Sequence, residues 1–232
     1  INTLWTKSNL ADLLDKLGER TVARRMYEEV IEIQTEKFGE GHKYTLATKG
    51  NLASLLEVLG ERKEARRLLD QVIEGNTALL GPRHADTLRA KSNLANVMKQ
   101  LGEKDEAMRL YREVAHEQTR LLGSMHTDTL NTKANLAFML GETGDATTAK
   151  TLYAAVIEGN TKQLGASHAD TLVDRGNLAE LQVLIGELRP AARVLPAVIH
   201  ELTTALGPLE SNRFTLIYRS AEALLWQKQG KR

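Results

Sequence analysis

Apolar residues recur along the chain at the spacing of one helix face. In residues 45–59 they form a single stripe on a helical wheel, which is typical of an amphipathic helix with one buried side. The stripe consists of Leu46, Leu52, Ala53, Leu56 and Leu59. A second stripe follows in residues 62–80, and Gly60 separates the two, as is common where a helix ends in a left-handed residue. The pattern predicts two helices joined by a tight turn.

This two-helix pattern occurs five times in the chain, with a period of 42 residues. The clearest marker is an asparagine followed by Leu-Ala, found at Asn9, Asn51, Asn93, Asn135 and Asn177. One such unit cannot bury its apolar stripe alone, so the units must stack on one another. We therefore predict an all-α fold, a right-handed α-solenoid of five full repeats and a C-terminal capping helix, forming a single array over residues 1–232. The repeats cover residues 1–41, 42–83, 84–125, 126–167 and 168–209, and the cap covers residues 210–232.

The repeated motif is T-L-x-x-x-x-N-L-A, followed by L-x-x-x-G and then by L-G-x-x-H. It resembles the 42-residue tetratricopeptide repeats of kinesin light chains, most clearly in residues 84–123, and the likeness extends from Leu4 to about Gly207. The resemblance implies a protein-binding scaffold in which the first helix of each repeat lines the concave surface.

The asparagine of each repeat points away from the apolar stripe of its own helix, and the resemblance places it in the concave groove. An amide offers two donors and one acceptor, so a row of amides suits the backbone of an extended ligand. In a second interpretation each asparagine ties its helix to the adjacent repeat, and the two roles are compatible. The residues that flank the row would set specificity. The expected peptide-binding residues are Asn9, Asn51, Arg89, Asn93, Asn96, Asn131, Asn135, Phe138 and Asn177.

One histidine lies in the loop before each first helix, at His42, His84, His126 and His168. Copies one repeat apart should be about 10 Å from each other, whereas a metal ligand must lie about 2 Å from its ion. We therefore expect the histidines to fix the loops by hydrogen bonds, and Asp86 and Thr87 to cap the following helix. No motif of a nucleophile, phosphate loop or metal site is present. We expect no catalysis, no cofactor and no metal.

Composition narrows the choice of partner. Lys and Arg total 31 against 30 for Asp and Glu, and aromatic residues make up 4%, which argues against nucleic acid as a partner. The absence of cysteine excludes disulfides and favours an intracellular, reducing compartment. No apolar stretch reaches the roughly 18 residues of a membrane span, so we expect no membrane insertion. Because the chain begins with Ile1, we expect it to be a segment of a longer or processed polypeptide.

These observations favour a scaffold whose concave groove binds a peptide segment or helix of a partner protein. Two alternatives remain open at this stage. The chain could be a structural or accessory subunit of a larger, multisubunit assembly, or it could be the regulatory repeat region of a multidomain protein.

Overall fold

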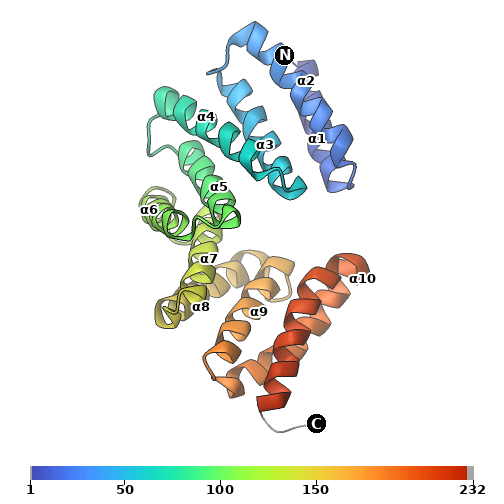
Figure 1. Ribbon diagram of the computed structural model, residues 1–232, viewed down its shortest axis with the longest axis vertical. Helices are drawn as coiled ribbons and strands as arrows, with labels where there is room; N and C mark the ends of the chain where they lie inside the picture. Colours follow the sequence, from blue (N-terminus) through green and yellow to red (C-terminus); the bar gives the residue numbers. More distant parts are fainter. Residues whose placement is uncertain (1, 229–232) are drawn as a thin grey trace. The chain divides into compact units, whose positions relative to one another are not determined.

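The computed structural model describes residues 2–228, and every regular element in that range is a helix (Figure 1). The predicted all-α class is confirmed, and the helices predicted for repeat two, 45–59 and 62–80, agree with α3 and α4. The helices are α1 (Asn2–Lys16), α2 (Arg20–Phe38), α3 (Lys43–Leu59), α4 (Arg62–Leu80), α5 (Ala85–Leu101), α6 (Lys104–Leu122), α7 (Thr127–Glu142), α8 (Ala146–Leu164), α9 (Ala169–Leu184) and α10 (Leu188–Lys228). None of the described helices is long and apolar enough to cross a membrane.

The helices group into two units, Ile1–Leu122 with α1 to α6 and Gly123–Arg232 with α7 to α10. Consecutive helices pack as pairs within each unit. In the first unit α3 also contacts α1 and α5, and in the second unit α7 contacts α9. Among the described residues, α4 makes no such contact with α2 or α6. The first helices of the repeats therefore form the inner layer of each unit, and the second helices form the outer layer.

Small residues mark the places where helices pack most closely. Ala53 of α3 and Ala65 of α4 are fully buried in one core cluster of the first unit, together with Leu56 and Leu69. Any larger side chain at these two positions would push the helices apart. The two alanines therefore let α3 and α4 pack closely.

Gly60 ends α3 in the left-handed region, with φ of 82°, and its backbone N–H donates to the carbonyls of Glu57 and Leu56. Only glycine adopts this conformation without steric cost, which explains its place at the end of the predicted helix.

The loop histidines act as helix caps. The Nδ1 atom of His84 accepts a hydrogen bond of 3.2 Å from the backbone N–H of Asp86, and His42, His126 and His168 repeat this arrangement. The loop-fixing role predicted for them is confirmed. The caps predicted at Asp86 and Thr87 are wrong, because His84 is the N-cap of α5 and these two residues already lie within its first turn. Thr87 instead donates from Oγ1 to the carbonyl of Gly81 at 2.9 Å, which closes the loop.

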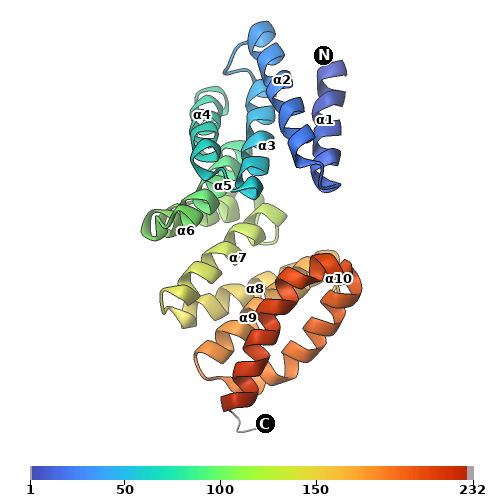
Figure 2. The same cartoon turned by 45° about the vertical axis from the view of Figure 1, so that its right-hand side comes forward.

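The C-terminal end departs from a plain helix pair. Residues 188–228 are assigned to one helix, α10, but the helix bends back between Leu202 and Ala221, so that its two parts lie side by side (Figure 2). Leu195 of its first part and Leu225 of its last part belong to the same core cluster, together with residues of α9. The two parts correspond to the second helix of repeat five and to the predicted cap. Residues 229–232 of that cap lie outside the described residues.

One side of α1, the side that corresponds to the interface with the preceding repeat in repeat two, is exposed. Leu10 and Leu13 are 46% and 52% exposed, whereas their counterparts in repeat two, Leu52 and Leu55, are 5% and 2% exposed. In repeat two the preceding helix pair covers these positions, and no helix in residues 2–228 does so for α1.

Candidate protein-binding surface

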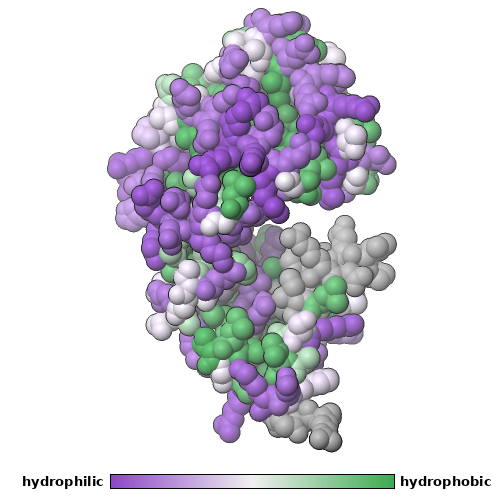
Figure 3. All heavy atoms as spheres, viewed as in Figure 1, coloured by the Kyte–Doolittle hydropathy of each residue, from purple (hydrophilic) through white to green (hydrophobic). Residues whose placement is uncertain are grey.

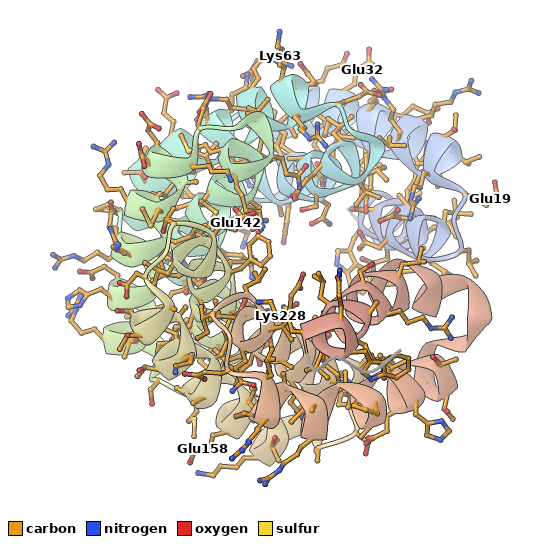
Figure 4. All side chains as sticks on the ribbon, turned by 60° about the horizontal axis from the view of Figure 1, so that its bottom comes forward. Glu19, Glu32, Lys63, Glu142, Glu158 and Lys228 are labelled. Carbon is orange, nitrogen blue, oxygen red and sulfur yellow. The ribbon has the colours of Figure 1, made fainter. Side chains whose placement is uncertain are left out.

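Side chains on the outer layer point away from the first helices. Glu32 of α2 and Lys63 of α4 do so in the first unit, and Glu158 of α8 does so in the second (Figure 4). Glu142 of α7, by contrast, points to the inner side. The inner surface of each unit is thus built from first helices, as the predicted groove requires.

In the first unit the inner surface contains a pocket of about 320 Å³ between α1 and α3, with α2 behind it. It brings two predicted site residues, Asn9 and Asn51, to one place. Its lining consists of Leu4, Trp5, Ser8, Asn9, Gln34, Phe38, Tyr44, Ala47, Thr48 and Asn51. Pockets of this size, partly apolar and with a few polar groups, are typical of ligand sites.

Aromatic rings gather at this pocket although they are scarce in the sequence. Trp5 is 65% exposed, and Phe38 stacks on His42 with ring centroids 4.8 Å apart. Gln34 is only 4% exposed, and its Oε1 accepts no hydrogen bond from any described residue. A buried acceptor without a partner costs free energy, so Gln34 is an energetically unfavourable polar group behind the pocket.

The asparagine of repeat two ties its helix to the adjacent repeat, as the second interpretation predicted. Asn51 donates from Nδ2 to Oδ1 of Asp12 at 3.3 Å, and thereby joins α3 to α1. Asp12 accepts a further hydrogen bond from the hydroxyl of Tyr27 on α2. Burial, and then the hydrogen bond to Asp12, raise the pKa of Tyr27, so its hydroxyl remains a donor. Asn51 therefore has the structural role, and it also lines the pocket.

Two further predicted residues are engaged within the first unit. Asn96 accepts a hydrogen bond from the hydroxyl of Tyr111, in the same way as Asp12 does from Tyr27. Arg89 donates from Nη2 to Oδ1 of Asp86, one turn earlier on α5, at 2.5 Å. Asn93 differs from both, because its half-buried amide makes no hydrogen bond to the described part of the chain.

The tyrosine contacts were missed in the sequence, although a signal for them is present. The tyrosine position of repeats one and three is paired with Asp12 and Asn96, which can accept a hydrogen bond. In repeat two the same two positions hold Ser54 and Leu69, so both partners change together.

In the second unit a smaller pocket of about 140 Å³ lies among α7, α8 and α9. It brings together the predicted residues Phe138 and Asn177, whereas Asn131 and Asn135 of α7 lie outside its lining. The lining consists of Ala137, Phe138, Gly141, Glu142, Tyr153, Asn177, Glu180, Leu181 and Leu184. Hydrophobic surface gathers over α9 on the face shown in Figure 3. No group of three potential metal ligands occurs among the described side chains of either unit.

Comparison with known proteins agrees with this architecture. Family models described as tetratricopeptide repeat match residues 1–78, 44–115 and 129–170. No curated protein sequence matches the chain. The solved repeats described as those of a kinesin light chain from Podosopora anserina are 25% identical, with 89% of this chain and 98% of that chain covered and a TM-score of 0.69.

Two more distant structures share the fold. BtubC (BKLC) from P. vanneervenii is 20% identical, with a TM-score of 0.71 over 87% of this chain and 80% of that chain. The apo quorum sensor NprR from B. thuringiensis is 16% identical, with a TM-score of 0.73 over 97% of this chain and 59% of that chain.

The chain belongs to the tetratricopeptide repeat family, since the family models together cover about two thirds of it. It is a kinesin light chain-like member, as the 42-residue motif and the similar solved repeats indicate. It is therefore a repeat scaffold of the class that binds other proteins, and folds of this class are generally non-enzymatic.

Proposed function

We propose that the chain binds a peptide segment or helix of a partner protein on the inner surface formed by its first helices. The observation that carries this proposal is the pocket between α1 and α3. There Asn9 and Asn51 lie beside an exposed tryptophan, Trp5, and beside Gln34, whose buried oxygen has no donor. An apolar surface with several convergent amide groups is suited to a polypeptide, which has both apolar side chains and backbone donors.

Asn93 provides the sharpest test of the proposed surface. Its amide forms no hydrogen bond with the described residues, so its replacement breaks no such bond. Removing it should leave a ligand group unpaired, at a cost of about 1–3 kcal/mol of binding free energy. The stability of the fold should change little. Trp5→Ala should likewise weaken binding, because an exposed ring in a pocket is a typical anchor.

The experiment is a selection of random decapeptides by phage display on the immobilised 232-residue chain, followed by titration of the enriched peptides. Asn93→Ala and Trp5→Ala should raise the Kd, and Lys63→Ala on the outer side of α4 should not. If Lys63→Ala weakens binding and the two inner-surface variants do not, the partner binds outside the groove.

The exposed side of α1 favours a second candidate, a subunit of a larger assembly. Leu10 and Leu13 lie on one side of α1, Leu17 follows its last residue, and each of the three is more than 45% exposed. Apolar patches of this kind are typical of protein interfaces. Sedimentation of the chain over a concentration series tests for self-association, and Leu13→Glu should abolish any association through this face.

A further inference from the structure

The small pocket in the second unit has a tyrosine hydroxyl without a partner. Tyr153 is 2% exposed and lines the pocket, and no described residue forms a hydrogen bond with its hydroxyl. In repeats one and three the equivalent hydroxyls of Tyr27 and Tyr111 donate to a polar residue on the first helix. In repeat four that position holds Phe138, whose ring cannot accept in the same way.

The pocket also contains an acidic group, the Glu180 carboxylate, and no lysine or arginine belongs to its lining. Glu180 has no ion-pair partner among the described residues, and burial raises its pKa. Burial also raises the pKa of Tyr153, and the carboxylates of Asp174, Glu180 and Glu142 add to this effect. The hydroxyl therefore lies in a negative electrostatic potential.

A lysine that reaches the end of α9 is already engaged. Lys228 of α10 donates from Nζ to the carbonyl of Val183 near the end of α9, at 3.4 Å. It forms no ion pair with Glu180 in the described structure.

We propose that the pocket formed by Phe138, Tyr153 and Glu180 binds a single lysine or arginine side chain of the partner segment. The cation would pair with the Glu180 carboxylate and donate to the oxygen of the Tyr153 hydroxyl. Its apolar stem would pack on Leu181 and Leu184, as the stems of long basic side chains do. The Phe138 ring adds a cation–π contact, which is strongest for a desolvated cation.

This inference rests on the proposed function, since it describes the charge of the segment that the inner surface binds. The volume of about 140 Å³ suits one side chain rather than a folded domain or a free cofactor. A half-buried carboxylate also discriminates strongly between partners, because a negatively charged segment would bring like charges together.

The test repeats the decapeptide selection on the wild-type chain, on Glu180→Gln and on Glu158→Gln. The last variant removes one negative charge from the same unit, but on α8, where Glu158 pairs with Lys162 on the outer side. Peptides enriched on the wild-type chain and on Glu158→Gln should contain Lys or Arg at a fixed position. This enrichment should be lost on Glu180→Gln and kept on Glu180→Asp.

The strongest arginine-containing peptide is then compared with its citrulline twin, which has nearly the same shape but no charge. Fluorescence anisotropy at about 150 mM salt, where distant charges are screened, should show about tenfold weaker binding of the twin to the wild-type chain. The two peptides should bind Glu180→Gln equally. Thermal melts of each variant check that the fold is retained.

The outcomes separate the two proposals. If no peptide is enriched on the wild-type chain, the proposed function fails and this inference fails with it. If neutral or acidic peptides are enriched and depend on Asn93, the proposed function stands and the cation pocket is overturned. Enrichment of basic peptides that persists on Glu180→Gln also overturns it.

Discussion

Among the carboxyl groups of the described residues, Asp174 has a pKa that its surroundings raise strongly. It lies buried on α9, where Asn160 of α8 donates to its Oδ2 from Nδ2 at 2.8 Å. Burial raises its pKa to about 6, and the nearby charge of Asp170 adds to the rise, whereas the hydrogen bond from Asn160 opposes it. The folded chain therefore binds this proton more tightly than the unfolded chain, where the pKa is near 3.9.

The sign of the pH dependence follows from these two values. Between about pH 4 and pH 6 the native state holds more protons, so the free energy of unfolding falls as pH rises through this window. Asp174→Asn removes the titration and keeps an acceptor for Asn160. We expect the variant to be more stable than wild type at pH 7.5, by up to about 3 kcal/mol, and to lose this advantage near pH 4. Urea unfolding of both proteins at several pH values measures this difference in stability. The exposed Asp105→Asn should not follow this course, and a pH-independent effect of Asp174→Asn would contradict the prediction.

The loop histidines permit a second prediction at the scale of single residues. Replacing His84 by Ala leaves the N–H of Asp86 without its acceptor at the start of α5. Loss of a helix cap costs about 0.5–2 kcal/mol of folding free energy. His116, exposed in the middle of α6, is the matched control, and His116→Ala should have almost no effect. Chemical denaturation of both variants, followed by circular dichroism, decides the matter, and equal losses would argue against a capping role.

At the scale of helices, the repeat register predicts very different roles for equivalent leucines. Leu55 is 2% exposed in the layer between repeats one and two, whereas Leu13 holds the same repeat position on the open side of α1. Leu55→Ala should cost about 2–4 kcal/mol of stability, because it leaves a cavity. Leu13→Ala should cost no more than about 1 kcal/mol. Comparable losses in urea midpoint for the two variants would mean that the side of α1 is covered in solution.

The helices themselves were largely predictable from the sequence. Apolar stripes at helical spacing and a glycine at each turn were sufficient to predict α3 and α4 to within two residues. The caps were not predicted, because histidine is not a usual cap residue and Asp86 and Thr87 are better candidates by side-chain type. The capping helix predicted after repeat five corresponds to the last part of α10, which packs back onto its first part.

The candidate surface was predictable only in outline. The asparagine row was found from its period, but the partners of Asn51 and Asn96 lie on other helices, at distances in sequence of 39 and 15 residues. Which residues face one another across two helices depends on packing, which a single-helix wheel does not contain. Repeat four has Phe138 at the position that Asp12 and Asn96 hold in repeats one and three. This difference can be interpreted only when the tyrosine that faces the position is known.

At the scale of the whole chain, the junction between α6 and α7 has the same loop as the other junctions. Gly123 has φ of 97°, close to Gly81 and Gly165, and His126 caps α7 as His84 caps α5. The sequence thus contains no linker at this point, and we maintain the prediction that residues 1–232 form one array. In repeat arrays, stability passes from each repeat to its neighbour, so a short array can unfold as one cooperative unit.

The two tryptophans of the chain make this prediction testable, because Trp5 lies in the first unit and Trp226 lies in the second. Both are more than half exposed, so Trp5→Phe and Trp226→Phe should leave the fold intact and give chains with one fluorescent reporter each. If the array is cooperative, urea unfolding should show the same midpoint for both reporters. Leu55→Ala, which acts in the first unit, should then lower the midpoint reported by Trp226 as well as that reported by Trp5. Two separate midpoints, with only the Trp5 transition shifted, would instead show that the two units unfold independently.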